Sequence, residues 1–187
     1  KRIHSKMGTT FIYVTHDQME AFALGDRIVV MEHGQIRQVG TPQELFNHPA
    51  NLYTASFVGT PPMNLFRDVA LKQGSGGWTV TLFDNKYLLP PAKAVGLTEA
   101  DQGRKVTLGI RPVHITLGDQ GIEATVEHSD VVEAEMHIQL RVGQQELLAI
   151  VPATNFGTFL RGRKVHFQLS AQRFHLFDPE TEERIGL

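Results

Sequence analysis

The residue in this sequence whose type and position most specifically suggest a chemical role is His16, which follows an apolar run. Residues 9–15 are all β-branched or aromatic, and this composition predicts a buried strand. A helical pattern starts at Gln18, so His16 is expected at the carboxyl end of a strand, where open α/β sheets bind ligands. Its imidazole can donate a hydrogen bond to a phosphate oxygen and help to position an attacking water. A lone histidine in a loop is more commonly a plain surface or packing residue, and both interpretations stay open at this point.

The acidic neighbours of His16 have a structural explanation. Asp17 can cap the helix that follows, and Glu20 three residues later completes a variant of the capping box. Gly25 fits the end of that helix. We therefore assign Asp17 and Glu20 to helix capping rather than to catalysis.

Other motifs for catalysis or metal binding are absent from the sequence. It contains no P-loop and no nucleophile elbow, and its nine histidines show no H-E-x-x-H spacing, so we expect no metal site. The glycine-rich stretch Gly74–Gly77 lies between two alternating patterns and no helix follows it. It predicts a hairpin turn rather than a phosphate-binding loop.

Composition narrows the class of protein. The 187 residues carry a net charge of −2, which argues against nucleic acid as the main partner. There is no cysteine for disulfides or thiolate metal sites, and no apolar run reaches the ~18–20 residues that span a bilayer. The first residues include neither an initiator Met nor a signal peptide. Because one strand cannot make a parallel sheet, we expect this chain to be the tail of a longer protein.

The pattern of residues predicts two domains, 1–60 and 61–187. In the first, strands at 27–31 and 35–39 flank a turn at His33–Gly34. Thr41, followed by a proline and by Glu44, predicts the start of a helix, and a second short helix is expected over 50–58. The prolines at 61 and 62 mark the boundary.

Beyond the boundary, helical periodicity gives way to strict alternation of apolar residues. Short strands separated by glycine-rich turns predict a small barrel or sandwich. The expected strands contain Trp78–Leu82, Val106–Ile110, Val113–Leu117, Met136–Val142, Leu148–Val151, Val165–Leu169 and Phe174–Phe177.

Several stretches resemble the ATPase subunits of ABC transporters. Residues 12–21 are similar to the switch-histidine region, and residues 26–36 and 38–49 resemble the hairpin and helix that follow it. Residues 57–65 look like the junction to an appended regulatory domain. Residues 108–115 and 175–181 are similar to landmarks of that OB-type domain. The resemblance covers nearly the whole chain and is nearest to the maltose and glycerol-3-phosphate importer ATPases.

This resemblance implies a fold and a site. The fold is an α/β C-terminal remnant of a P-loop ABC ATPase domain over residues 1–60, followed by an all-β OB-type (TOBE-like) regulatory barrel over 61–187. His16 would be the catalytic, cofactor-binding residue that contacts the γ-phosphate of ATP in a nucleotide-sandwich dimer. The family's P-loop, signature and Walker B motifs are expected upstream, so ATP and Mg²⁺ belong to the complete protein. We expect neither ATP binding nor hydrolysis from this chain alone.

The resemblance also implies partners and a location. They are a second ATPase subunit in a homodimer, membrane-spanning permease subunits and a cytoplasmic regulator, on the inner face of the cell membrane and without nucleic acid. The predicted function is ATP binding and energy coupling in an importer of sugars or related solutes. Two alternatives stay open: an importer of polyamines, iron or sulfate, and a free-standing OB-type module that binds a ligand. The chain departs from the family at Val113, where relatives usually carry Glu, and at residues 129–134.

Overall fold

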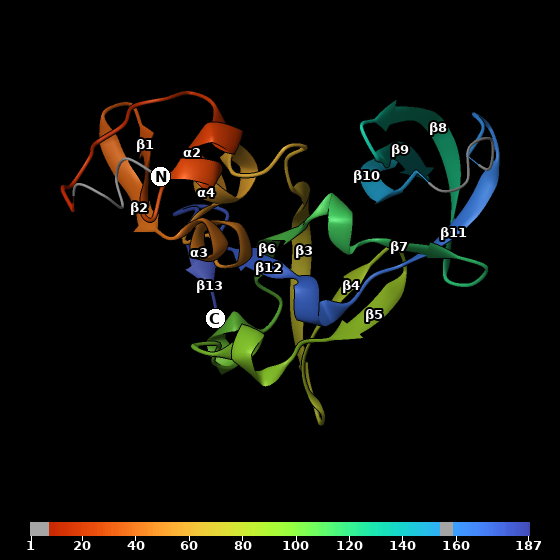
Figure 1. Ribbon diagram of the computed structural model, residues 1–187. Coiled ribbons are helices and arrows are strands. Elements are labelled where there is room, and N and C mark those ends of the chain that lie inside the picture. Colours follow the sequence, from red (N-terminus) through yellow and green to blue (C-terminus); the bar gives the residue numbers. More distant parts are fainter. Residues whose placement is uncertain (1–7, 154–158) are drawn as a thin grey trace. The chain divides into compact units, whose positions relative to one another are not determined.

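The computed structural model describes residues 8–153 and 159–187, which divide into two compact units, Lys1–Thr60 and Pro61–Leu187. Figure 1 shows the helices and strands of both units. Each unit has its own hydrophobic cluster. Among the described residues, no helix is both long and apolar enough to cross a bilayer.

The first unit is a β-hairpin covered by three short helices. The hairpin joins β1 (Ile28–Glu32) to β2 (Gln35–Gly40) in antiparallel register. Its turn places His33 and Gly34 at φ values of 48° and 80°, so both adopt the left-handed conformation of the tightest hairpin turns. The expected hairpin is therefore confirmed. The described residues of this unit contain no parallel strand pair.

The helices of the first unit begin at side-chain caps. Asp17 caps α2 (Gln18–Leu24), Thr41 caps α3 (Pro42–Asn47) and Asn51 caps α4 (Leu52–Phe57). At Thr41 the full capping box forms, because the Glu44 carboxylate accepts a hydrogen bond from the Thr41 backbone N–H at 2.7 Å. The helix signals in the sequence are confirmed here to within about two residues.

Residues 9–15 do not form the buried strand that their composition predicts. They have no regular structure, and Ile12 and Val14 are 92% and 90% exposed. A strand satisfies its backbone N–H and C=O groups only beside another strand. The described residues offer this segment no such neighbour, so strong β-propensity alone leaves it extended and open.

The second unit consists of two antiparallel sheets. The six-stranded sheet has the order β13-β12-β6-β3-β4-β5, and the five-stranded sheet has the order β10-β9-β8-β11-β7. Strand bounds in the first sheet are β3 Asn64–Gly74, β4 Gly77–Leu82, β5 Asn85–Leu88, β6 Lys105–Ile110, β12 His175–Phe177 and β13 Arg184–Ile185. Those in the second are β7 Thr116–Gly118, β8 Ile122–Val132, β9 Glu135–Val142, β10 Gln145–Pro152 and β11 Lys164–Gln168.

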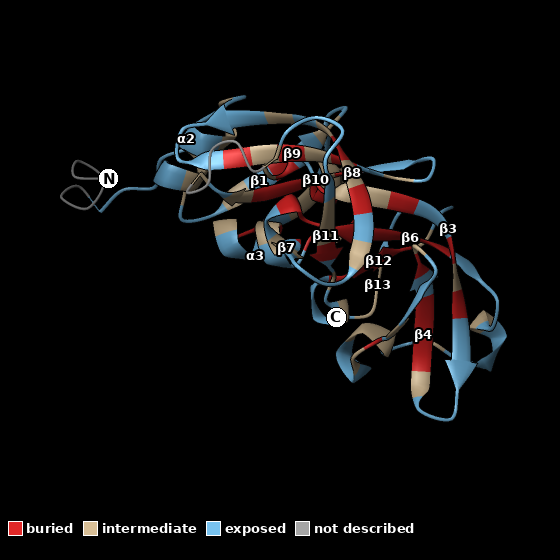
Figure 2. Ribbon diagram, turned by 90° about the vertical axis from the view of Figure 1, so that its right-hand side faces the viewer, coloured by how far each residue is buried: buried red, intermediate tan, exposed pale blue. Residues whose placement is uncertain are grey.

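One hydrophobic core runs through both sheets, and Figure 2 shows its buried residues on strands such as β4, β6 and β12. Aromatic rings join the sheets: Phe83, after β4, meets Phe66 and Phe167 edge-on, at centroid distances of 5.3 and 5.7 Å. Asn64 adds a polar link. Its side-chain amide donates to the carbonyl of Leu148 at 2.9 Å and accepts from its N–H at 2.7 Å, as a neighbouring strand would.

One sequence expectation for the second unit needs adjustment. The alternating residues 113–117 predict one strand, but Pro112–His114 forms a 3₁₀ turn, η3, and only β7 follows it. Pro112 fixes a turn-compatible φ and removes the backbone donor, which favours the turn. At Gly74–Gly77 the tight turn between β3 and β4 is confirmed. The remaining 3₁₀ turns are η1 (Pro91–Ala94), η2 (Glu99–Asp101) and η4 (Ala171–Arg173).

Candidate functional site

His16 lies exposed in a loop that its neighbours hold in shape. The backbone N–H of Asp17 donates to the Thr15 hydroxyl at 3.0 Å, and one Asp17 carboxylate oxygen accepts from the backbone N–H groups of Met19 and Glu20. The imidazole is therefore presented on an ordered connection into α2, although no strand precedes it.

Glu20 does not close a capping box as expected. Its carboxylate instead accepts hydrogen bonds from the hydroxyls of Tyr13 and Thr15, at 3.1 and 3.0 Å. The bond to Glu20 raises the pKa of the Tyr13 phenol, because the negative carboxylate favours the protonated form. Glu20 thus ties the segment on one side of His16 to the helix on the other.

Gln18 fixes the start of α2 to the end of α4. Its side-chain amide donates to the carbonyl of Phe57 at 2.5 Å and accepts from the backbone N–H of Gly59 at 2.9 Å. Both bonds join residues about forty positions apart in the sequence. They place the loop that carries His16 on the helical side of the first unit.

An apolar groove of about 340 Å³ opens beside this anchor, between α2, α3 and the chain after α4. Sequence reasoning did not find it. The signal available in the sequence was the pair of apolar residues Phe22 and Phe46, one in each of two short helices. His16 does not line the groove, whose lining residues are Gln18, Met19, Phe22, Pro42, Gln43, Phe46, Asn47, Gly59 and Thr60.

One face of the hairpin is apolar and open. Val29 lies directly opposite Val39, and Met31 lies opposite Ile36. All four side chains are between 40% and 62% exposed. The apolar side chains of residues 11–14 are exposed as well, and we call the two sets together the open face. Exposed apolar surface of this kind marks an interaction site.

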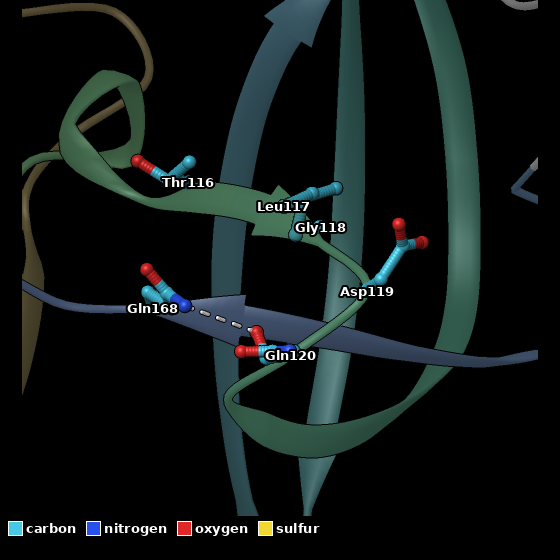
Figure 3. A pocket seen from close by; sticks show the side chains of 6 residues that line it. All are labelled: Thr116, Leu117, Gly118, Asp119, Gln120 and Gln168. Atoms are coloured by element: carbon cyan, nitrogen blue, oxygen red, sulfur yellow. Dashed lines mark hydrogen bonds between the residues drawn. The ribbon is translucent and has the colours of Figure 1, made fainter.

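The second unit contains a polar depression of about 310 Å³ at the β7–β8 connection (Figure 3). Gln168 on β11 donates to the carbonyl of Gln120 at 3.4 Å across it. Asp119 provides its only carboxylate, and no basic side chain lines it. The depression can offer hydrogen bonds to a polar molecule. Its lining residues are Thr116, Leu117, Gly118, Asp119, Gln120 and Gln168.

The two motifs of the second unit that resemble a regulatory domain lie side by side. The motif at residues 108–115 begins in β6 and the motif at 175–181 begins with β12, and these two strands pair with Gly109 opposite His175. After β12, the Asp178 carboxylate accepts from the backbone N–H groups of Glu180 and Thr181 and pairs with Arg104. These contacts lower the Asp178 pKa to about 2, with the Thr181 N–H the largest cause. Within residues 8–153 and 159–187, no cluster of three or more His, Asp or Glu could hold a metal ion.

Comparison with known proteins identifies both halves of the second unit. A family model described as the MalK OB fold domain matches residues 59–115, and one described as the TOBE domain matches residues 108–177. A solved structure of the cytoplasmic molybdate-binding protein ModG aligns with a TM-score of 0.48 and 16% identity, covering 62% of this chain and 96% of that one.

Curated relatives align along nearly the whole chain. The multiple sugar-binding transport ATP-binding protein MsmK of Streptococcus mutans is 36% identical and is matched by 98% of this chain over 52% of its own length. The sn-glycerol-3-phosphate import ATP-binding proteins UgpC of Burkholderia lata and Shigella sonnei are 35% and 36% identical. They are matched by 100% and 99% of this chain, over 51% and 50% of their lengths. The chain thus spans about half the length of these relatives.

Proposed function

Because this chain belongs to the family of ABC-importer ATP-binding proteins with a MalK-type OB fold and a TOBE domain, we propose that it forms part of an energy-coupling subunit. The subunit would bind ATP and drive the import of sugars or related solutes. The similarity of nearly the whole chain to MsmK and UgpC carries this proposal.

Residues 1–60 would complete the α/β ATPase domain. The open face supports this assignment, since an apolar hairpin surface needs a cover that the described residues do not provide. A neighbouring strand from the rest of the ATPase domain would satisfy the backbone of residues 9–15 and turn them into the strand that their composition favours. His16 would then stand at the carboxyl end of that strand.

His16 would contact the γ-phosphate of ATP. Its ring N–H can donate to an oxygen on which negative charge develops, and a donor fixed in advance stabilises that charge at little reorganisation cost. The bonds among Thr15, Asp17 and Glu20 supply this fixation. Mg²⁺ and the other phosphate contacts would come from parts of the subunit outside this sequence.

Residues 61–187 would regulate the subunit and pair it with a second copy. The exposed apolar pair Val131 and Val132, at the end of β8, supports such a contact. Permease subunits in the membrane and a cytoplasmic regulator would be further partners, placing the protein at the inner face of the cell membrane.

A reconstituted ATPase tests this proposal. The chain would be mixed with the part of MsmK that it does not match, and ATP hydrolysis would be measured. We expect activity only in the mixture, and a loss of roughly 10²–10³ in turnover for His16→Ala. His33→Asn is the matched control, because His33 is a second histidine of the first unit and Asn tolerates its φ of 48°. Equal turnover for His16→Ala and the control would contradict the proposed role.

A free-standing OB-type module remains the second candidate. Its supporting observation is that the second unit has a core of its own. Residues 61–187, expressed alone, should fold and associate in circular dichroism and sedimentation. Specific binding of an oligosaccharide or anion by this segment, with no ATPase activity in the mixture above, would favour the module over the importer subunit.

A further inference from the structure

Strands β6, β12 and β13 bring basic side chains to one face of the six-stranded sheet. His175 on β12 lies opposite Gly109 on β6, and Phe177 lies opposite Arg184 on β13. Residues opposite each other in an antiparallel pair share a face, and faces alternate along each strand. His175 and Arg184 therefore share a face, and Arg111, two residues beyond Gly109, continues it.

Three 3₁₀ turns of the same unit add further basic groups. Lys93 lies in η1, which the backbone bond from Leu187 N–H to the Ala92 carbonyl, 2.9 Å long, ties to the chain beyond β13. His114 ends η3, which begins directly after Arg111, and Arg173 ends η4, two residues before His175. We call these six residues the basic cluster: Lys93, Arg111, His114, Arg173, His175 and Arg184.

The members of the basic cluster act on one another electrostatically. Burial is the largest cause that lowers the pKa of His175, to about 3, and the charges of Lys93, Arg111 and Arg184 lower it further, with a smaller contribution from His114. The pKa of Lys93 is also lowered, first by burial and then by Arg184 and Arg173. The charges that lower the pKa values of His175 and Lys93 all belong to basic residues, so the electrostatic potential at this face is positive.

The basic cluster combines buried and more exposed residues. Arg111 and His175 are only 1% and 4% exposed, whereas Lys93 and Arg184 are half-buried and Arg173 is exposed. The Nδ1 atom of His175 is buried without a hydrogen-bond partner. Burying such a polar atom unpaired is costly, and native proteins generally avoid it. Mutual repulsion and an unpaired buried imidazole both favour a bound group that carries negative charge and accepts hydrogen bonds.

We propose that the basic cluster binds a phosphate-type dianion, either free phosphate or the phosphoryl group of a phosphorylated metabolite. Two negative charges offset the repulsion among the cations of the basic cluster, and phosphate oxygens accept charge-assisted bonds from guanidinium and ammonium groups. The site lies wholly within the second unit and involves none of the residues around His16. It goes beyond the proposed ATPase function, and one can fail without the other.

Calorimetric titration of the full chain tests the site. The probes are inorganic phosphate, glucose 6-phosphate and, as the uncharged comparison, glucose, at constant ionic strength maintained with chloride. We expect phosphate or the sugar phosphate to bind and glucose to show no binding. Tighter binding of glucose 6-phosphate identifies a phosphorylated metabolite as the ligand, and equal or tighter binding of inorganic phosphate identifies free phosphate.

Lys93→Gln and Arg184→Gln should each weaken binding of the phosphate probes about tenfold, which is the effect of one lost charge-assisted bond. Lys72→Gln is the matched control, since Lys72 is exposed on β3 and is not among the groups that lower the pKa of Lys93 or His175. The Lys72→Gln variant should bind phosphate with an affinity within about twofold of the parent's, because an exposed charge outside the cluster contributes little.

Thermal unfolding separates binding from folding. Without phosphate, Lys93→Gln should unfold at the same temperature as the parent or higher, because the substitution removes repulsion. With phosphate, the parent should gain stability and Lys93→Gln should gain much less. The proposal is overturned if neither phosphate probe binds above the chloride background, or if Lys72→Gln weakens binding as much as Lys93→Gln.

Discussion

The two units of this chain treat their apolar side chains in opposite ways. The second unit buries them in one core to which strands β3, β4, β6 and β8–β11 all contribute residues. Among its described residues, the first unit buries few apolar side chains and leaves the open face exposed; the buried ones are Val30, Leu45, Leu52, Ala55 and Val58. Since burial of apolar area is the main force for folding, we expect the second unit to fold by itself and the first unit to be stabilised by a partner that covers its open face.

The largest effect is expected in the core of the second unit. Phe167 is fully buried and meets Phe83 edge-on at 5.7 Å, so Phe167→Ala should lower the free energy of unfolding by about 3–5 kcal/mol. Trp78, the sole tryptophan, lies in the same core and reports the transition by fluorescence in urea. Leu160→Ala, at a 62% exposed site, serves as the control and should change stability by less than about 0.5 kcal/mol. A similar shift for both variants would show that the second unit lacks the core described.

Acid should weaken the second unit through Asp178. Its pKa in the folded protein is about 2, below the ~4 of an unfolded aspartate, so its contribution is present above pH 4 and is lost as the pH falls towards 2. Asp178→Asn should cost about 1–2 kcal/mol at pH 7 and far less near pH 2, since the side chain is mostly covered but not fully buried.

The measurement is the difference in unfolding free energy between parent and Asp178→Asn at the two pH values. Asp119→Asn, in the exposed β7–β8 connection, controls for a general loss of negative charge. A cost for Asp178→Asn that stays constant with pH would contradict this assignment.

Removing the N-cap of α3 tests the stability of the first unit alone. Thr41→Ala removes the hydroxyl that accepts from the Glu44 backbone N–H at 3.3 Å, and should destabilise α3 by about 1 kcal/mol. Amide hydrogen exchange over residues 42–47 measures the effect, with the exposed Thr60→Ala as control. The strands of the second unit should exchange as before, and a matching change there would mean that the units do not fold separately.

The smallest effect is expected on the open face. Met31→Lys changes a 53% exposed side chain and should alter the stability of the isolated chain by no more than about 0.5 kcal/mol. In the mixture with the unmatched part of MsmK, the same substitution should weaken association strongly, because a charge would be buried there. If Met31→Lys leaves association unchanged, the open face is not the surface that contacts the rest of the ATPase domain.

Local signals in the sequence predicted local structure well. The capping box at Thr41 and Glu44, the turn at His33–Gly34 and the alternation in β9 are confirmed because each depends on residues close together in the chain. Long strands were harder to predict. β3 contains a bulge with Asp68 at φ 59°, and the second half of β8 is exposed, so neither keeps a regular apolar period.

The candidate sites depend on tertiary structure that the sequence did not reveal. Residues 9–15 have the composition of a strand, but a strand needs a partner, and composition does not say whether one is present. The burial of Arg111 and His175 also escaped prediction, since charged and polar types are usually exposed. The available signal was the position of each residue in the sequence. Arg111 directly follows Ile110, and His175 lies between Phe174 and Leu176, and these apolar neighbours are all buried.

We propose that the first unit is a partial ATPase domain whose open face receives the rest of that domain. Amide hydrogen exchange of residues 11–14 and of the β1–β2 hairpin, with and without the unmatched part of MsmK, tests it most directly. We expect rapid exchange of residues 11–14 in the chain alone and strong protection in the mixture, as these residues become a strand beside His16. Rapid exchange of residues 11–14 in both samples, with ATP and Mg²⁺ present, would contradict it.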